Sequence, residues 1–64
     1  MRLANVEGRA CAVFVEGGVD LAAASSGMFS SLVDDVIPLL SDVASWLESA
    51  KPELDPRLAT EHLQ

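Results

Sequence analysis

Residues 7–22 read EGRACAVFVEGGVDLA, an apolar run enclosed by two glycine-containing segments. Strands joined by tight turns show this pattern, because glycine adopts the positive φ that two-residue hairpin turns require. The pattern predicts a turn at Glu7-Gly8, a central strand over residues 10–15 and a second turn over residues 16–18. Flanking strands over residues 2–6 and 19–22 complete a predicted three-stranded antiparallel meander.

The central predicted strand is apolar on both faces. Successive side chains of a strand point to opposite sides of the sheet. One side receives Ala10, Ala12 and Phe14, and the other receives Cys11, Val13 and Val15. An antiparallel sheet with one solvated face carries polar residues on that face. We therefore expect other parts of the molecule to cover both faces of the sheet.

A helix is predicted after a short connection. Residues 23–30 are small and serine-rich and include a glycine, which is typical of a connection. Ser31 opens a segment that resembles a capping box, and Asp35 is a second possible N-cap. A proline seven residues past a cap costs about 3 kcal/mol, whereas in the first turn it removes no hydrogen bond. Because Pro38 follows these candidates, we expect a short turn from Ser31, a kink near Ile37 and a main helix from Asp35 or Pro38 to Ala50.

The predicted helix has a broad apolar face. On a helical wheel this face contains Val36, Leu40, Val43, Ala44 and Leu47, and one flank of it contains Leu39, Trp46 and Ala50. The sequence thus predicts an α+β fold, a small three-stranded antiparallel meander followed by a kinked helix packed on one face. Residues 1–50 form this domain, and residues 51–64 form a linker or a short helix that begins at Asp55-Pro56.

Size and charge restrict the functional class. The chain has 64 residues with 4 Lys and Arg against 10 Asp and Glu, a net charge of −6 that disfavours nucleic-acid binding. Its N-terminus lacks the apolar run of a signal peptide, and no segment is long and apolar enough for a membrane span. A single cysteine, Cys11, rules out an internal disulfide. We expect a cytoplasmic protein with a reduced thiol.

The chain shows no pattern of catalytic, cofactor-binding or metal-ligating residues. Its one histidine, His62, lies in the polar tail, far along the chain from Cys11, and the pair matches no zinc-ligand spacing. The side chains of Asp34 and Asp35 diverge on a helix, so they do not share a metal ion by themselves. We interpret His62 as a solvated tail residue and Cys11 as a small buried apolar residue.

Three stretches carry a resemblance to a known family. They read MRLANVEGRA at residues 1–10, GVDL at residues 18–21 and GMFS at residues 27–30. Together they resemble the start of bacterial fumarylacetoacetate hydrolase family proteins, including 2-hydroxyhepta-2,4-diene-1,7-dioate isomerase-like members. These share an opening strand, a Gly-Arg turn, a third strand like Gly-Val-Asp-Leu and a Phe-Ser step into helices. Residues 32–40 depart from the family, which usually has an Asp-Pro helix start there.

The resemblance implies an accessory N-terminal domain that is inactive alone. In this family a following catalytic domain binds a divalent metal, usually Mg²⁺, through acidic residues, and acts on keto or diketo acids by C–C bond hydrolysis, isomerisation or decarboxylation. No such residue carries over to this chain. The expected partner is the chain's own catalytic domain or another protein surface.

Trp46 has two interpretations, as a core residue or as part of a contact surface. The flank of Leu39, Trp46 and Ala50, or the second face of the central strand, is the predicted contact with the missing domain. A contact role predicts that Trp46→Ala costs the isolated domain little stability. The alternative function is a free-standing acidic protein-interaction module, in one form a homodimer through the open sheet face or the Leu39 and Trp46 flank.

Overall fold

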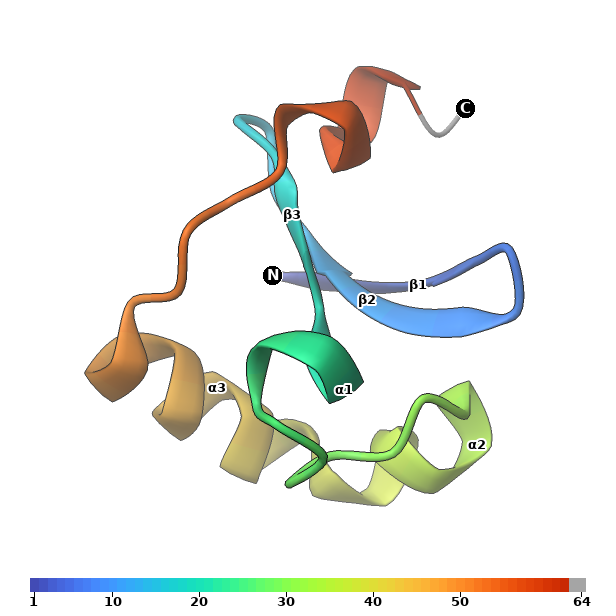
Figure 1. Cartoon of the computed structure of the whole chain (residues 1–64), viewed down its shortest axis with the longest axis vertical. Helices are drawn as coiled ribbons and strands as arrows, with labels where there is room; N and C mark the ends of the chain where they lie inside the picture. The colour runs from blue at the N-terminus through green and yellow to red at the C-terminus, as the bar shows by residue number, and fades with distance from the viewer. Residues whose placement is uncertain (63–64) are drawn as a thin grey trace.

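The structure, a computed structural model, describes residues 1–62 and contains the predicted meander. Strands β1 (Arg2–Val6), β2 (Arg9–Val13) and β3 (Gly18–Asp20) form an antiparallel sheet in the order β1-β2-β3 (Figure 1). The first hairpin closes through the pair Val6 and Arg9. Glu7 and Gly8 have φ values of 53° and 82°, as a two-residue turn requires. The fold class is therefore α+β, as predicted.

The central and third strands are shorter than the sequence predicted. β2 ends at Val13, because Phe14 turns away and donates its N–H to the Gly17 carbonyl at 2.7 Å. Val15, which the sequence prediction placed in this strand, lies outside it and is 79% exposed. β3 ends at Asp20, because the Asp20 carboxylate accepts from the Ala23 N–H at 3.3 Å and starts helix α1 (Leu21–Ala24). The prediction of a strand through residue 22 is therefore wrong in its second half.

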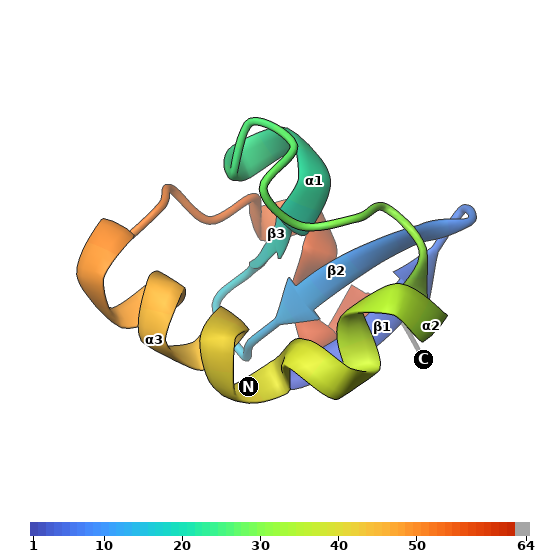
Figure 2. The same cartoon turned by 90° about the horizontal axis from the view of Figure 1, so that it is seen from below.

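The helical layer has the predicted kink. Helix α2 (Val33–Val36), the 3-10 turn η1 (Ile37–Leu39) and helix α3 (Leu40–Ala50) follow one another without interruption (Figure 2). Pro38 lies inside η1, where its ring is tolerated because the hydrogen-bond pattern changes there. Lys51, at φ 46°, ends α3 before Pro52.

The predicted cap of this helical segment is shifted by one residue. The Ser30 hydroxyl, not that of Ser31, accepts from the Leu32 N–H at 3.0 Å. The same hydroxyl donates to Asp35 Oδ2 at 3.0 Å. Leu32, which has no capping side chain, precedes the first helical residue. The capping-box prediction at Ser31 is therefore wrong, because the serine one position earlier satisfies the turn.

The helices cover one face of the sheet. Their shared core is apolar and consists of Ala10, Ala12, Val19, Leu21, Phe29, Val36 and Val43. Leu40 and Ala44, expected on the buried face, are exposed. A 3-10 turn advances by about 120° per residue against about 100° for an α-helix, so η1 rotates the face of α3 relative to that of α2. This rotation keeps Val43 inside and moves Leu40 outward.

The tail covers part of the other face. Gly18 and Asp55 exchange two backbone hydrogen bonds of 3.0 and 2.7 Å, and Thr60 donates through its N–H and hydroxyl to the Phe14 carbonyl. Two 3-10 turns follow, η2 (Pro56–Leu58) and η3 (Thr60–His62), and in Figure 1 they lie on the side of the sheet opposite the helices. Cys11 and Val13 are each 2% exposed on this side. Both faces of β2 are therefore covered, as predicted, and the second cover is the chain's own tail.

The helix-start pattern Asp55-Pro56 in the tail begins a helical turn, as predicted. The Asp55 carboxylate accepts from the Arg57 N–H at 2.9 Å and caps η2, with Pro56 as its first residue. The helix expected from Asp55 is divided into two 3-10 turns, and its predicted last residue, Leu63, lies outside the described residues.

Candidate contact surfaces

The predicted contact residues lie along one helical segment but differ in exposure. Leu39 is 40% exposed in η1, and Ala50 is exposed at the end of α3. Eleven helical steps separate them, about 16 Å along the axis. Trp46 lies between them and is partly buried, with its ring edge-on to Phe29 at 5.6 Å between centroids and 72° between planes. Leu39 and Ala50 are thus available for contact, whereas part of Trp46 belongs to the core.

The second face of the central strand is not the open surface that the sequence suggested. Cys11 and Val13, which point to this face, are almost fully buried. The buried Ala59 and the partly buried Leu58 of the tail lie on this side of the sheet. The prediction of a contact surface at this part of β2 is therefore wrong, because residues 55–62 already occupy it.

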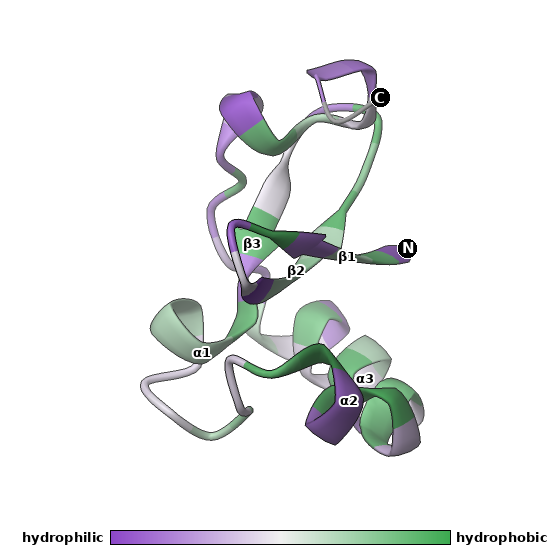
Figure 3. Cartoon of the chain, turned by 90° about the vertical axis from the view of Figure 1, so that its right-hand side faces the viewer, coloured by the Kyte–Doolittle hydropathy of each residue, from purple (hydrophilic) through white to green (hydrophobic). Residues whose placement is uncertain are grey.

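A group of exposed apolar residues at the start of the helical layer was missed. Leu32 is 58% exposed, Ile37 51% and Leu40 37%. In Figure 3 the helical layer is largely green, with a purple segment in α2. The exposure of Leu40 follows from the rotation at η1, so its signal in the sequence was Pro38, whose effect on helical phase an uninterrupted wheel ignores. Leu32 lies before the first helical residue. We call these three residues and Leu39 the helical apolar patch, because all four are exposed within residues 32–40: Leu32, Ile37, Leu39 and Leu40.

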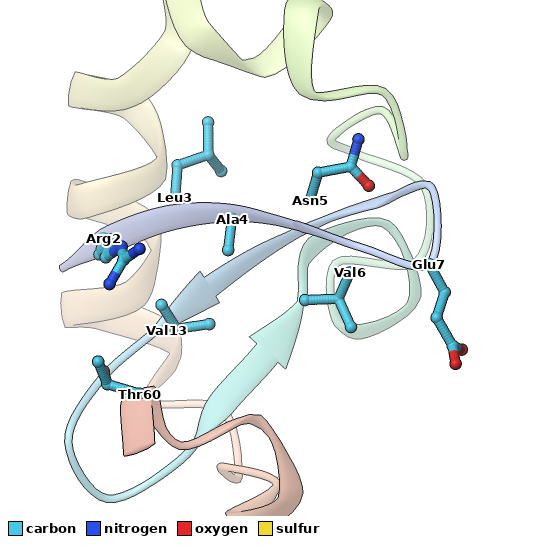
Figure 4. Close-up of a pocket in the computed structure, with 8 residues that line it drawn as sticks. All are labelled: Arg2, Leu3, Ala4, Asn5, Val6, Glu7, Val13 and Thr60. Carbon is cyan, nitrogen blue, oxygen red and sulfur yellow. The ribbon is translucent and has the colours of Figure 1, made fainter. Parts of the chain in front are cut away.

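A groove of about 490 Å³ follows β1 along its whole length. Every residue from Arg2 to Glu7 lines it, together with Val13 of β2 and Thr60 of the tail. Figure 4 shows Leu3 and Asn5 on one side of the strand and Ala4 and Val6 on the other. The lining of the groove combines apolar side chains with the polar Asn5 and Thr60, and Arg2 and Glu7 lie at opposite ends of the strand. The length and shape of the groove suit an extended polypeptide better than a small metabolite.

A second groove of about 420 Å³ is lined by two ion pairs together with Val6, Glu7, Cys11 and Leu58. Arg9 Nε donates to Asp20 Oδ2 at 2.6 Å, and Arg57 Nη2 donates to Asp55 Oδ2 at 2.9 Å. These hydrogen bonds hold the pKa of each carboxyl below its usual range and raise the pKa of each guanidinium. Both carboxylates also cap a helical turn. The ion pairs therefore stabilise the fold locally and leave neither arginine as a dedicated anion receptor.

Cys11 borders this groove but is not an activated nucleophile. Burial raises the pKa of its thiol, and the Asp20 carboxylate raises it further. A catalytic cysteine requires the opposite shift, toward the thiolate at neutral pH. His62 is exposed, with Nε2 3.6 Å from the Glu61 carboxylate. The structure does not bring these two residues together as a pair.

No cluster of three or more His, Cys, Asp or Glu side chains suited to a metal ion occurs within residues 1–62. Over the same residues, no helix has both the length and the apolar character that a bilayer crossing needs. In comparisons with known proteins, no family model, curated sequence or solved structure matches the chain.

Proposed function

We propose that this chain is the accessory N-terminal domain of a metal-dependent enzyme of the fumarylacetoacetate hydrolase family and is inactive alone. The reaction of the whole enzyme is C–C bond hydrolysis, isomerisation or decarboxylation of a keto or diketo acid. Mg²⁺ and its carboxylate ligands belong to the catalytic domain in this proposal, and this chain contributes contact surface. The proposed location is the cytoplasm, with Cys11 reduced.

One observation supports the proposal most: the stretches that resemble the family contain a first strand, a turn, a third strand and a step into the helices of this fold, in that order. Gly8-Arg9 forms the step from the first turn into β2, and Gly18-Val19-Asp20 is β3. Phe29-Ser30 leads into α2: the Phe29 ring is buried in the core, and the Ser30 hydroxyl accepts the Leu32 N–H just before the helix begins. Turn residues determine the direction in which the chain continues, so a resemblance at turns supports a similar order of elements.

The helical apolar patch is the surface on this chain that best suits an adjoining domain. Leu32, Ile37, Leu39 and Leu40 are all at least one-third exposed. Clustered exposed apolar side chains mark interaction sites more often than scattered ones do. Leu39, predicted from the sequence, belongs to the patch, and Trp46 and Ala50 extend it along α3.

The first test is the reading frame beyond Gln64. A downstream Gly-x-Asn-Tyr segment followed by paired acidic residues supports the proposal, and a stop codon contradicts it. In the longer protein, Leu39→Ser should loosen the two domains and expose the linker to proteolysis. Val15→Ser is the matched control, because Val15 is 79% exposed in the β2–β3 turn. Equal proteolysis rates for the two variants would contradict a contact at Leu39.

The alternative, a free-standing acidic interaction module, is favoured by a different observation. Among residues 1–62, β1 has a neighbouring strand on one side only. The open side of β1 is a surface for main-chain pairing that does not depend on a catalytic domain.

A further inference from the structure

The two edges of the sheet differ in how they are protected. At the β3 edge, Asp55 adds a backbone bridge to Gly18, and a Cβ placed on Gly18 would lie 2.7 Å from Leu58 Cβ. This edge is occupied by the tail. At the β1 edge, no segment of residues 1–62 pairs with the strand on the side away from β2. Within the described part of the chain, one edge of the sheet is therefore closed and the other is open.

The hairpin turn determines which backbone groups point out of the open edge. A two-residue turn closed by Val6 and Arg9 makes this pair a hydrogen-bonded one, and such pairs alternate along an antiparallel ladder. Ala4 and Arg2 therefore bond to β2, whereas Leu3 and Asn5 direct their N–H and C=O groups outward. Ala10, which lies opposite Asn5 on β2, confirms this alternation of hydrogen-bonded and non-bonded pairs. Its N–H points away from β1 and donates to the Ser31 carbonyl at 2.7 Å.

β1 also lacks the usual protection of an edge strand. Natural edges carry proline, bulges or a charge in mid-strand that prevents pairing with another chain. β1 is a regular five-residue strand, RLANV, whose only charge is Arg2 at its start. The Asn5 side chain folds back over the turn, where its Oδ1 accepts from the Gly8 N–H at 2.9 Å. Within residues 1–62, no backbone hydrogen bond outside the β1–β2 ladder uses the Leu3 or Asn5 backbone, and a groove runs beside the strand.

We propose that β1 binds β1 of a second copy of this chain, antiparallel and about a two-fold axis at Ala4. Leu3 and Asn5 both direct their N–H and C=O groups outward, so Leu3 of one copy can pair with Asn5 of the other. The two symmetric pairs together give four backbone hydrogen bonds. Ala4 then faces Ala4 in the closely spaced, non-bonded position, where a small side chain fits. The result is one six-stranded sheet in the order β3-β2-β1-β1-β2-β3.

The charges of the strand are complementary to themselves in this arrangement. Arg2 lies at one end of the groove along β1 and Glu7 at the other. Antiparallel pairing places Arg2 of one copy across from Val6 and beside Glu7 of the other, and does so twice. The apolar stem of Arg2 covers Val6 while its guanidinium reaches the acid. Within one chain these two charges are about 16 Å apart along the strand, so they interact only between copies.

The inference does not rest on the proposed function, because it uses only β1 and its edge. The test is sedimentation velocity of the 64-residue chain at concentrations between about 1 μM and 1 mM. We expect a concentration-dependent dimer. Asn5→Pro removes the outward N–H and leaves the N–H groups that bond to β2 intact, whereas the control Asn5→Ala retains the outward N–H. Asn5→Pro should raise the dimer dissociation constant about thirtyfold relative to Asn5→Ala, since two hydrogen bonds are lost per dimer.

A charge exchange gives an independent readout. Arg2→Glu and Glu7→Arg should each weaken the dimer, and the double variant should restore it toward the wild-type dissociation constant. A chain that stays monomeric up to about 1 mM would overturn the proposal. A dimer that is equally stable in Asn5→Pro and Asn5→Ala, with both variants folded by circular dichroism, would also overturn it. Failure of the double charge variant to recover would contradict the two-fold register.

Discussion

Individual residues show how local chemistry and tertiary packing share control of this fold. Asp55 caps a helical start as the sequence predicted. Asp20, which the sequence placed inside a strand, also caps a helical start, because its carboxylate accepts the Ala23 N–H. Cys11 has the predicted character of a small buried side chain. Trp46 is the residue that the sequence left open between core and surface. Its contact with Phe29 depends on where the connection of residues 23–30 places that ring, which no local rule supplies.

Replacing Trp46 separates the two interpretations of this residue. A purely exposed tryptophan could be replaced by alanine at little cost. Because the Trp46 ring contacts the buried Phe29, we expect Trp46→Ala to lower the free energy of unfolding by about 2 kcal/mol, below the roughly 3–5 kcal/mol of a fully buried tryptophan. Trp46→Phe is the control that keeps a ring beside Phe29. Urea unfolding measures both, and an unchanged midpoint for Trp46→Ala would contradict the packing described.

The Arg9–Asp20 pair predicts a pH dependence of stability. The hydrogen bond from Arg9 holds the pKa of the Asp20 carboxyl below its usual range, which is about 3.9 in an unfolded chain. This contribution to stability is therefore fully present above about pH 5 and is lost as pH falls through the lowered folded pKa. Asp20→Asn should flatten the acid limb of the stability profile while it retains the cap of α1. Arg9→Gln should flatten it similarly, and a wild-type slope in either variant would contradict the pair.

At the level of elements, the turn and break signals of glycine and proline were interpreted correctly, whereas the helix cap at Asp20 and the change of helical phase at η1 were not. The hairpin at Glu7-Gly8 follows from glycine chemistry, and the break near Ile37 follows from Pro38. Helix α1 was missed because Leu21 and Ala22 suit a strand as well as a helix, and the Asp20 cap determines the outcome. The exposure of Leu40 was missed because a helical wheel assumes one rotation per residue throughout, whereas η1 changes it.

The tail is the element whose role can be tested most directly. A Cβ added at Gly18 would lie 2.7 Å from Leu58 Cβ and 2.9 Å from the Ala12 carbonyl oxygen. Gly18→Ala should therefore displace residues 55–62 and cost about 1–3 kcal/mol. Since the tail lies over the face that buries Cys11, the variant should also speed the reaction of this thiol with a disulfide reagent.

Val15→Ala serves as the control for this prediction, because Val15 is exposed in the neighbouring turn and makes little packing contact. It should leave both stability and thiol reactivity unchanged. A Gly18→Ala chain in which Cys11 stays as unreactive as in the wild type would show that the tail does not protect this face.

The whole molecule is a sheet of three strands between a helical layer and a short tail, with a radius of gyration of 10.4 Å. A domain of this size buries only about 60% of the surface that its unfolded chain exposes. Its exposed apolar patch and its open β1 edge are therefore large features relative to its core. The sequence indicated both the two-sided strand and the excess of apolar helix surface. It did not indicate which surface remained open, because that depends on where residues 55–62 pack.

The central claim is that this chain supplies contact surface to a metal-dependent enzyme and no catalytic group of its own. The most direct test is a spectrophotometric assay of acylpyruvate cleavage with Mg²⁺ or Mn²⁺, for the 64-residue chain and for the longer protein that the proposal requires. We predict that the longer protein turns over the substrate and that the 64-residue chain does not exceed the rate of the metal ion alone. Turnover by the 64-residue chain above that rate would contradict the claim.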